Sequence, residues 1–455
     1  MLIGAEKIWV AGALHSDWLL RIGDDGRIRE VGPAATLGAA DVFLADRLLL
    51  PGHVNAHSHA FQRLLRGRTQ RAGPKGDNFW TWRQVMYGVA QKLSPDDLYT
   101  VAHQLFIEML LSGVTSVGEF HYLHHQADGT PYDDSLAMSK ALAQAAKDSG
   151  IRLTILRTIY LHGGFDAPLE AHQKRFADKD IDKALAELKK LEDFCADEAD
   201  ARIDWGFAGH SVRAMRLEEL QKVCATFPKR SFHMHVSEQQ KEVKECQERF
   251  GLTPIALLES EGLLDKRTTL VHATHASFEE VELIKQHGSA VCFCPGTEAD
   301  LGDGLGPASE LFQAGVPISL GTDGQTFSSI LQEARRLEMH ERLRKQQRNV
   351  LADEGQDASA YLHQAATVYG AKALGLACGA FEVGQFADGF SVALNDPHLC
   401  GGADNPLSTW YFSGDSRALR DVFVGGEFVV RDGVHKGYEA SRGSYQALSE
   451  KLFSS

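Results

Sequence analysis

The sequence contains no apolar run of about 18 residues, the length that a membrane-spanning helix needs. Its first residues also lack the basic stretch followed by a long apolar segment that is typical of a secretory signal. These absences argue against a membrane partner and predict a cytoplasmic protein.

Positively charged residues are fewer than negatively charged ones. The chain has 47 lysines and arginines against 61 aspartates and glutamates, a formal net charge of −14. Such a balance disfavours non-specific binding to nucleic acid or to anionic lipid, so we expect no nucleic-acid partner. It still allows a local basic pocket for a small carboxylate.

Cysteines are few, odd in number and scattered. The seven lie at positions 195, 224, 246, 292, 294, 378 and 400. Their spacing suggests no disulfide framework, and Cys292-x-Cys294 is too short for the usual zinc clip. We expect reduced, mostly buried thiols.

The 455 residues have the composition of an ordinary globular protein, with 44% hydrophobic and 24% charged residues. Residues 1–50 alternate short apolar runs with glycine-rich breaks, and residues 384–433 repeat this pattern, which is typical of β-hairpins. Neither piece makes a convincing core alone, and chain termini commonly lie close together. We therefore predict a composite β-sandwich domain from residues 1–50 and 380–455, beside a second domain of residues 51–379.

Residues 51–379 alternate strand-like runs with helical patterns, the signature of parallel βα units. After a first strand that leads to His57, the expected strands are Val114–Phe120, Arg152–Tyr160, Ile203–His210, Ser231–Val236, Thr268–Ala273, Ala290–Cys294 and Pro317–Thr322. Helical spacing occupies Leu98–Leu111, Asp134–Lys147, Ala184–Glu198, Leu217–Thr226 and Phe278–Gln286. The pattern predicts an α/β fold, a TIM-like (β/α)8 barrel.

The segment Pro51–Arg63 carries the first functional signal, His57 and His59. Residues i and i+2 of a strand point to the same side, so both imidazoles can bind one metal ion. With 20 histidines in 455 residues, about one His-x-His pair is expected by chance, so this motif alone is weak evidence.

Further reactive residues fall at the ends of predicted strands, where (β/α)8 barrels place catalytic groups. His235 and Asp323 complete a donor set for a divalent cation, with zinc favoured and iron or manganese as alternatives. A cation held in this way lowers the pKa of a bound water molecule towards about 7. Glu238 could carry a proton to a leaving nitrogen, and His272 could hydrogen-bond the water or a developing charge.

Each of these residues also has a purely structural interpretation. His235 and His272 could be hydrogen-bonded wall residues, and Glu238 could be solvated. Asp323 could be a turn residue or a helix cap. His233 forms a second His-x-His pair with His235, and strand alternation alone does not separate the two. The His-x-x-Glu spacing favours His235.

In combination these motifs resemble the amidohydrolase superfamily, over essentially the full chain. The resemblance rests on residues 51–59, His235–Glu238, Val271–His272, Cys294–Pro295 and Leu320–Asp323. The strand 203–210 offers no lysine to bridge two metals, so the resemblance implies one metal ion per chain. Residues 294–298 depart from the Pro-x-Ser-Asn pattern that relatives often show, which weakens inference about that loop only.

A closer resemblance is to the formimidoylglutamate deiminases, which hydrolyse N-formimidoyl-L-glutamate to N-formyl-L-glutamate and ammonia in histidine degradation. It rests on Asn55–Arg63, Phe79–Arg83 with Met86 and Tyr87, Gly118–Tyr122, His210–Arg213 and Gly321–Gln325. A substrate with two carboxylates implies fixed cations, for which Arg83 and Arg213 are candidates. The other implied substrate contacts are Gln62, Tyr122 and His210. A surface arginine stacked on Trp80 or Trp82 is the alternative for Arg83.

The resemblance further implies that Asp323 and His272 orient the attacking water. Residues 61–90 are expected to form a flap over the site, which relatives often supply across the interface of a homodimer. Two other functions stay open at this point. One is a deaminase of a guanine-like or triazine-like heterocycle, and the other is a catalytically inactive barrel scaffold.

Overall fold

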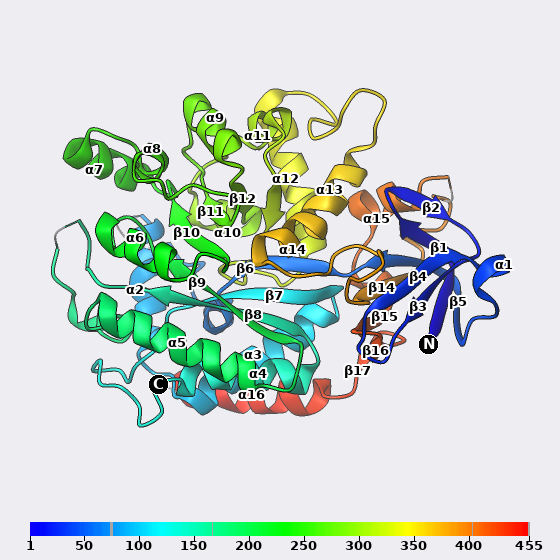
Figure 1. Ribbon diagram of the computed structural model, residues 1–455, viewed down its shortest axis with the longest axis horizontal. Helices are drawn as coiled ribbons and strands as arrows, with labels where there is room; N and C mark the ends of the chain where they lie inside the picture. Colours follow the sequence, from blue (N-terminus) through cyan, green and yellow to red (C-terminus); the bar gives the residue numbers. More distant parts are fainter. Residues whose placement is uncertain (73–75, 166, 403, 454–455) are drawn as a thin grey trace.

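The computed structural model describes residues 1–72, 76–165, 167–402 and 404–453. Two sheets organise it: an eight-stranded parallel sheet, and a nine-stranded mixed sheet at one end of the molecule (Figure 1). The predicted fold class is confirmed: a (β/α)8 barrel carries a small β domain built from both ends of the chain.

The barrel strands follow one another in chain order, each parallel to its neighbours. They are β6 His53–Ser58, β7 Val114–His121, β8 Arg152–Ile159, β9 Ile203–Gly209, β10 Phe232–Val236, β11 Thr268–His272, β12 Ala290–Phe293 and β13 Ile318–Leu320. The seven strands that were predicted with bounds all appear, with ends that differ by at most two residues, and the first strand, expected to lead to His57, is β6. Their side chains are almost all buried because helices cover the outside and side chains fill the inside.

The first and last strands meet just beyond β13. A parallel bridge joins Ser58 to Asp323, where the Asp323 N–H donates to the His57 carbonyl at 3.0 Å. The His59 N–H donates back to the Asp323 carbonyl at 3.2 Å. The barrel therefore closes at the residues that the sequence marks as metal ligands.

Helices pack around the barrel with their apolar faces inward (Figure 1). They are α2 Phe79–Ala90, α3 Pro95–Leu110, α4 Ala137–Ser149, α5 Ile181–Asp197, α6 Leu217–Thr226, α7 Gln240–Phe250, α8 Pro254–Ser260, α9 Phe278–His287, α10 Pro295–Leu301, α11 Ala308–Ala314, α12 Ile330–Lys345, α13 Ala358–Ala366, α14 Val368–Leu374 and α15 Pro406–Ser413, with 3₁₀ turns η1 Ala60–Leu65, η2 Ala171–Gln173 and η3 Ser416–Ala418. No helix in the described ranges is both long and apolar enough to cross a bilayer.

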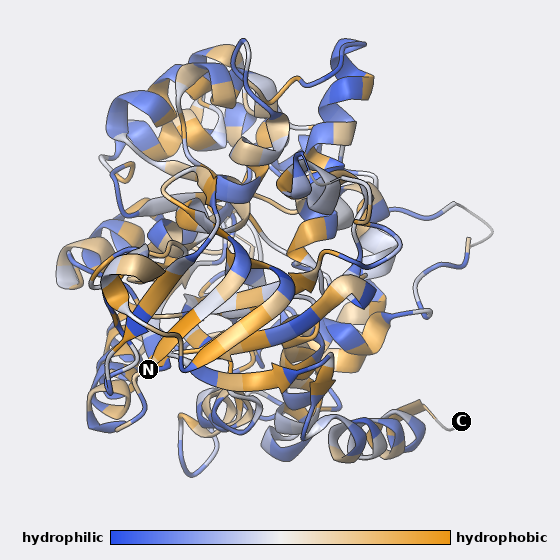
Figure 2. Cartoon of the chain, turned by 90° about the vertical axis from the view of Figure 1, so that its right-hand side faces the viewer, coloured by the Kyte–Doolittle hydropathy of each residue, from blue (hydrophilic) through white to orange (hydrophobic). Residues whose placement is uncertain are grey.

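The small sheet joins strands from the two ends of the sequence. Its strands are β1 Leu2–Val10, β2 Ala13–His15, β3 Trp18–Ile22, β4 Ile28–Pro33, β5 Val42–Pro51, β14 Gly389–Ala393, β15 Leu419–Val424, β16 Glu427–Arg431 and β17 Val434–His435, with the short helix α1 Ala34–Leu37 after β4. The two halves meet where β5 pairs antiparallel with β14, from Pro51 opposite Gly389 to Arg47 opposite Ala393. Hydrophobic and hydrophilic residues interleave along these strands, which Figure 2 shows from their side of the molecule.

This sheet curls until its β4 edge returns to the second half of the chain. The Ile28 N–H donates to the Gln385 carbonyl, and the Gly384 N–H donates to the Ile28 carbonyl, both at 2.8 Å. Ile3, Leu20 and Phe423 are among the buried side chains that the curl encloses. The small domain thus has a core of its own.

The last helix, α16 Tyr438–Phe453, runs along the barrel rather than the small sheet (Figure 1). Lys92 Nζ donates to the Leu452 carbonyl at 3.0 Å, and Lys451 lies 3.3 Å from the Asp97 carboxylate at the start of α3. The predicted small domain, residues 1–50 and 380–455, includes this segment. The domain boundaries stay a prediction, and within them α16 lies against the other unit.

Part of the segment 61–90, expected as a flap, is helical. Asn78 caps α2: its side chain accepts hydrogen bonds from the N–H groups of Trp80 and Thr81, and Thr81 Oγ1 accepts from the Asn78 N–H. Residues 73–75 of the expected flap lie outside the described residues.

Candidate active site

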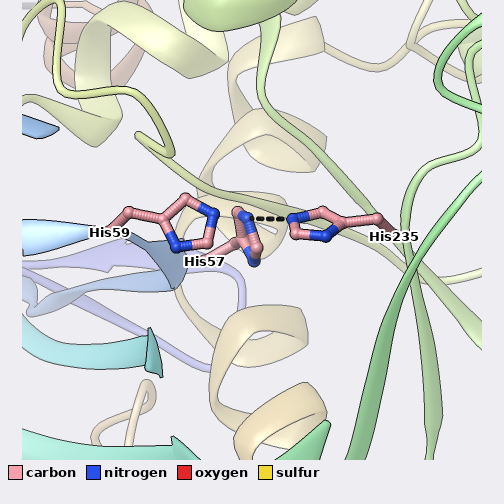
Figure 3. Close-up of side chains that lie close together, drawn as sticks. All are labelled: His57, His59 and His235. Carbon is pink, nitrogen blue, oxygen red and sulfur yellow. Dashed lines mark hydrogen bonds between the residues drawn. The ribbon is translucent and has the colours of Figure 1, made fainter. Parts of the chain in front are cut away.

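Three histidines and an aspartate converge at the C-terminal ends of the barrel strands. Figure 3 shows His57 between His59 and His235, and the Nε2 atoms of His57 and His235 are 3.2 Å apart. Asp323 Oδ1 lies 3.2 Å from His59 Nε2 and 3.4 Å from His57 Nε2. The four predicted ligands, distant in the sequence, therefore face one point.

Hydrogen bonds on the far side of two rings fix which nitrogen is available. His59 Nδ1 donates to the Phe120 carbonyl at 2.8 Å, and His235 Nδ1 donates to the His210 carbonyl at 3.0 Å. With Nδ1 protonated, a neutral imidazole presents its Nε2 lone pair to the common point.

Burial sets the charges of these groups. It lowers the pKa of His57 to about 3 and also lowers the pKa values of His59 and His235, so all three rings are neutral near pH 7. Burial alone would raise the pKa of Asp323, but its contacts with His57, His59 and His272 lower it overall. Three neutral imidazoles and one carboxylate are a donor set that fits a divalent cation.

The backbone beneath the donors is constrained. A Cβ at Gly321 would lie 2.7 Å from the His57 Cβ and 2.8 Å from the His57 carbonyl oxygen, so only glycine fits there. Asp323 and His272 adopt positive φ angles of 40° and 71°, which non-glycine residues rarely do and which are typical of functional sites. The Glu119 carboxyl accepts from Ser58 Oγ and from the Ala60 N–H, both at 2.6 Å, and so braces the end of β6.

Glu238 and His272 lie beside the donor set. His272 Nε2 is 3.8 Å from Glu238 Oε1 and 3.7 Å from Asp323 Oδ2. Burial raises the pKa of Glu238. Burial lowers the pKa of His272, but Glu238, Asp323 and Glu298 together raise it well above the usual value. This pair combines a carboxyl that can hold a proton with an imidazolium next to it.

The five predicted substrate contacts line one cavity with Glu238, His272 and Asp323. They are Gln62, Arg83, Tyr122, His210 and Arg213. The Gln62 amide donates to Tyr122 Oη at 3.1 Å. The Arg83 Cζ atom also lies 5.7 Å from the centre of the Trp80 ring and 5.1 Å from the centre of the Tyr87 ring. Arg83 therefore both lines the cavity and lies close to the Trp80 ring, the contact that was its alternative interpretation.

His233, the ambiguous histidine of β10, donates from Nε2 to the Ala373 carbonyl at 2.9 Å. It is not among the converging donors.

Other residues of the cavity were not predicted to contact the substrate. Phe79, Trp82 and Met86 on α2 line the cavity together with Arg83. Their spacing, i, i+3, i+4 and i+7, marks one face of a helix and could have revealed them. Glu298, whose Oε1 lies 3.3 Å from His272 Nδ1, gave no signal because this contact depends on the fold.

The sequence is similar to a family of hydrolases and to individual proteins within it. The family model described as "Amidohydrolase family" matches residues 48–429. A formimidoylglutamate deiminase from Pseudomonas aeruginosa is 40% identical, with 99% of each chain covered. A 5-methylthioadenosine/S-adenosylhomocysteine deaminase from Haloarcula marismortui is 28% identical, with 90% of this chain and 87% of that protein covered.

Solved structures agree in fold. An amidohydrolase from Brucella melitensis superposes with a TM-score of 0.91 at 34% identity, covering 99% of each chain. An adenosine deaminase from Xanthomonas campestris with bound zinc has a TM-score of 0.83 at 23% identity, covering all of this chain and 98% of its own. The matched segment spans the whole barrel, with the converging donors inside it, and the β14 and β15 strands of the composite sheet, so the chain belongs to the amidohydrolase family.

Proposed function

We propose that this protein is a metal-dependent aminohydrolase that converts N-formimidoyl-L-glutamate to N-formyl-L-glutamate and ammonia in histidine degradation. One observation carries the proposal: two arginines, Arg83 and Arg213, line the same cavity as Glu238 and the converging donors. A dicarboxylate needs such fixed cations, whereas a neutral heterocycle does not. The identity to a formimidoylglutamate deiminase over the whole chain supports the same substrate.

The donor set suits one divalent ion per chain, held by His57, His59, His235 and Asp323. Zinc accepts this combination of nitrogen and oxygen ligands most readily, and Fe²⁺ and Mn²⁺ are the alternatives. When bound, such an ion supplies a Lewis acid that makes water nucleophilic near neutral pH.

The side chains around the ion bind the substrate. Arg83 and Arg213 bind the two carboxylates of the substrate, while Gln62, Tyr122 and His210 add hydrogen bonds at its other polar groups. These contacts hold the amidine carbon next to the attacking water.

Proton transfer falls to Glu238. It removes one proton from the water that attacks the amidine carbon and delivers it to the terminal nitrogen. It then takes the second proton of that water, from the hydroxyl group now on the carbon, and passes it to the same nitrogen. The C=O bond forms as the C–N bond breaks, and the nitrogen leaves as ammonia. The raised pKa of Glu238 lets it hold the proton between these steps. Asp323 and His272 orient the water, and the imidazolium of His272 stabilises the charge that develops.

We also propose that the enzyme is cytoplasmic and works as a homodimer. The seven cysteines, all free, suit a reducing compartment. Sedimentation of the purified protein tests the dimer.

An ammonia assay tests the function. Purified, zinc-loaded protein should release ammonia from N-formimidoyl-L-glutamate and not from guanine or an aminotriazine. Arg213→Ala should raise KM for the formimidoyl substrate, whereas Arg442→Ala, which removes an exposed arginine paired with Glu439 on α16, should not. Ammonia from the heterocycles alone would favour that deaminase class. Absence of stoichiometric metal and of all activity would favour a scaffold.

A further inference from the structure

Arg213 has a buried carboxylate behind it. Arg213 follows β9, and Glu242 lies in the first turn of α7. Their side chains are 11% and 1% exposed, and Arg213 Nε lies 3.9 Å from Glu242 Oε1. That distance allows strong attraction between the charges but is too long for a hydrogen bond.

The polar atoms of this pair are not satisfied. Within the described part of the chain, Arg213 Nε donates no hydrogen bond, and neither Glu242 oxygen accepts a well-aligned one, although the peptide N–H of Glu238 lies near enough to lower the pKa of Glu242. Buried polar atoms are nearly always paired, so such a group of orphans needs an explanation. An ion pair without a direct hydrogen bond leaves the guanidinium free to bind a different anion, such as a carboxylate of a ligand.

Arg213 also faces space that a ligand can occupy. It lines the inner cavity beside Glu238 and an outer cleft that includes Gln84 and Lys241. Glu242 is not among the residues lining either space. The guanidinium therefore has Glu242 on one side and the ligand space on the other.

We propose that Glu242 is the resident counter-ion of Arg213 and takes up a proton from solvent when a substrate carboxylate binds that guanidinium. This rests on the proposed function, because it requires a substrate that carries a carboxylate. The exchange is one proton transfer: a buffer acid in the solvent loses a proton and Glu242 gains an O–H bond, and the carboxylate of the ligand replaces that of Glu242 as the anion beside Arg213. Glu242 is thus a positioning residue, since it acts through Arg213.

The groups that face Glu242 agree with this exchange. Burial raises the pKa of Glu242 to about 7; Arg213, the peptide N–H of Glu238 and His272 lower it, and the Glu238 carboxylate raises it. Cys246, one turn later on α7, has a pKa raised to about 12 by burial and is neutral. A ligand carboxylate beside Arg213 adds a second negative charge near Glu242, which raises the pKa of Glu242 further.

Ligand affinity should therefore fall as pH rises. Below pH 7 Glu242 is already protonated and does not compete for Arg213. Above pH 7 it is ionised in the free enzyme, so the dissociation constant should rise by up to tenfold per pH unit. In Glu242→Gln this rise should disappear, and the variant should bind more tightly than the wild type at pH 8.

Calorimetry of the zinc-loaded enzyme with the reaction product, N-formyl-L-glutamate, tests the proposal. Titrations in buffers of different ionisation enthalpy give the number of protons taken up. The wild type should take up close to one proton per ligand at pH 8 and close to none at pH 6. Glu242→Gln should take up close to none at either pH. The matched control Glu282→Gln, which removes a half-exposed carboxylate on α9, should behave as the wild type does.

The outcomes separate two kinds of failure. If the product binds and Glu242→Gln shows the same proton uptake and pH dependence as the wild type, Glu242 is not the exchanging group. If the wild type takes up no proton at pH 8, the exchange is also wrong, whether or not the variant folds. If neither substrate turnover nor product binding occurs at any pH, the proposed function falls and the exchange falls with it.

Discussion

At the scale of single residues, Glu238 can be tested apart from metal binding because it is not one of the four converging donors. Glu238→Gln keeps the size of the side chain but cannot carry a proton. We expect kcat to fall by about 10²- to 10⁴-fold, the usual contribution of a general acid or base, with metal content unchanged. Ammonia release and metal analysis on the same preparation measure both. Full turnover in the variant would remove Glu238 from the mechanism.

The sequence revealed individual residues only where spacing limits the geometry. His57 on β6 and His59 just after it are two residues apart in extended backbone, and the His-x-x-Glu spacing separated His235 from His233. The contacts of Glu298 with His272 and of Glu242 with Arg213 join different strands and helices. No local pattern encodes such distances, so these two carboxylates could not be assigned from sequence.

At the scale of elements, α2 positions part of the cavity wall, and its cap can be removed without touching the site. Asn78→Ala deletes the side-chain acceptor for two N–H groups at the start of α2, which costs about 1 kcal/mol. Because Trp82 and Arg83 lie on this helix, KM should rise several-fold while kcat changes little. Steady-state kinetics measure both. Asn78→Ser keeps the cap and should retain the KM of the wild type; an equal loss in both variants would contradict the role of the cap.

A buried ion pair joins the barrel to the small sheet. Arg152 on β8 binds the carboxylate of Asp388, just before β14, through hydrogen bonds of 2.9 and 3.1 Å. Asp388→Ala leaves the guanidinium buried without its partner and should destabilise the fold by about 3–5 kcal/mol.

Urea unfolding followed by circular dichroism should show this as a lower midpoint. The double replacement Arg152→Met with Asp388→Leu removes both charges and should recover much of the loss. A single variant as stable as the wild type would show that the pair contributes little.

Elements were predictable to different degrees. The seven strands β7 to β13 were predicted to within two residues at each end because they are short runs rich in apolar residues and bounded by turn signals. The first barrel strand was harder to place: the apolar run at residues 47–50 belongs to β5 of the small sheet, and the barrel begins with the more polar β6. The helix α2 was missed because its residues were predicted only as part of a flap over residues 61–90, although Asn78 and Thr81 form a capping box at its start. The position of α16 depends on packing against α3, which follows from the fold and not from the local pattern.

At the scale of the whole molecule, the metal should contribute to stability as well as to catalysis. The proposed ligands come from β6 and the residue after it, from β10 and from the turn after β13, so one ion would link the two strands that close the barrel with a third across it. A ligand at a thousand times its dissociation constant stabilises a fold by about 4 kcal/mol. Removing the ion should lower the melting temperature by on the order of 5 °C and abolish turnover.

Differential scanning fluorimetry with and without a chelator measures this shift. The same chelator saturated with zinc is the control and should have no effect. Added zinc should restore the melting temperature, while magnesium, which prefers oxygen ligands, should not. An unchanged melting temperature after verified metal removal would show that the closed barrel does not depend on the ion.

The pairing of β5 with β14 has a consequence for how the protein is made. β5 ends at Pro51, but the strand that covers its free edge begins at Gly389. On the ribosome this edge stays open while the entire barrel is synthesised, and an open strand edge can pair with neighbouring chains. The nascent polypeptide is therefore most exposed to aggregation until residues 389–393 emerge, and chaperone binding should concentrate on its first fifty residues during that interval.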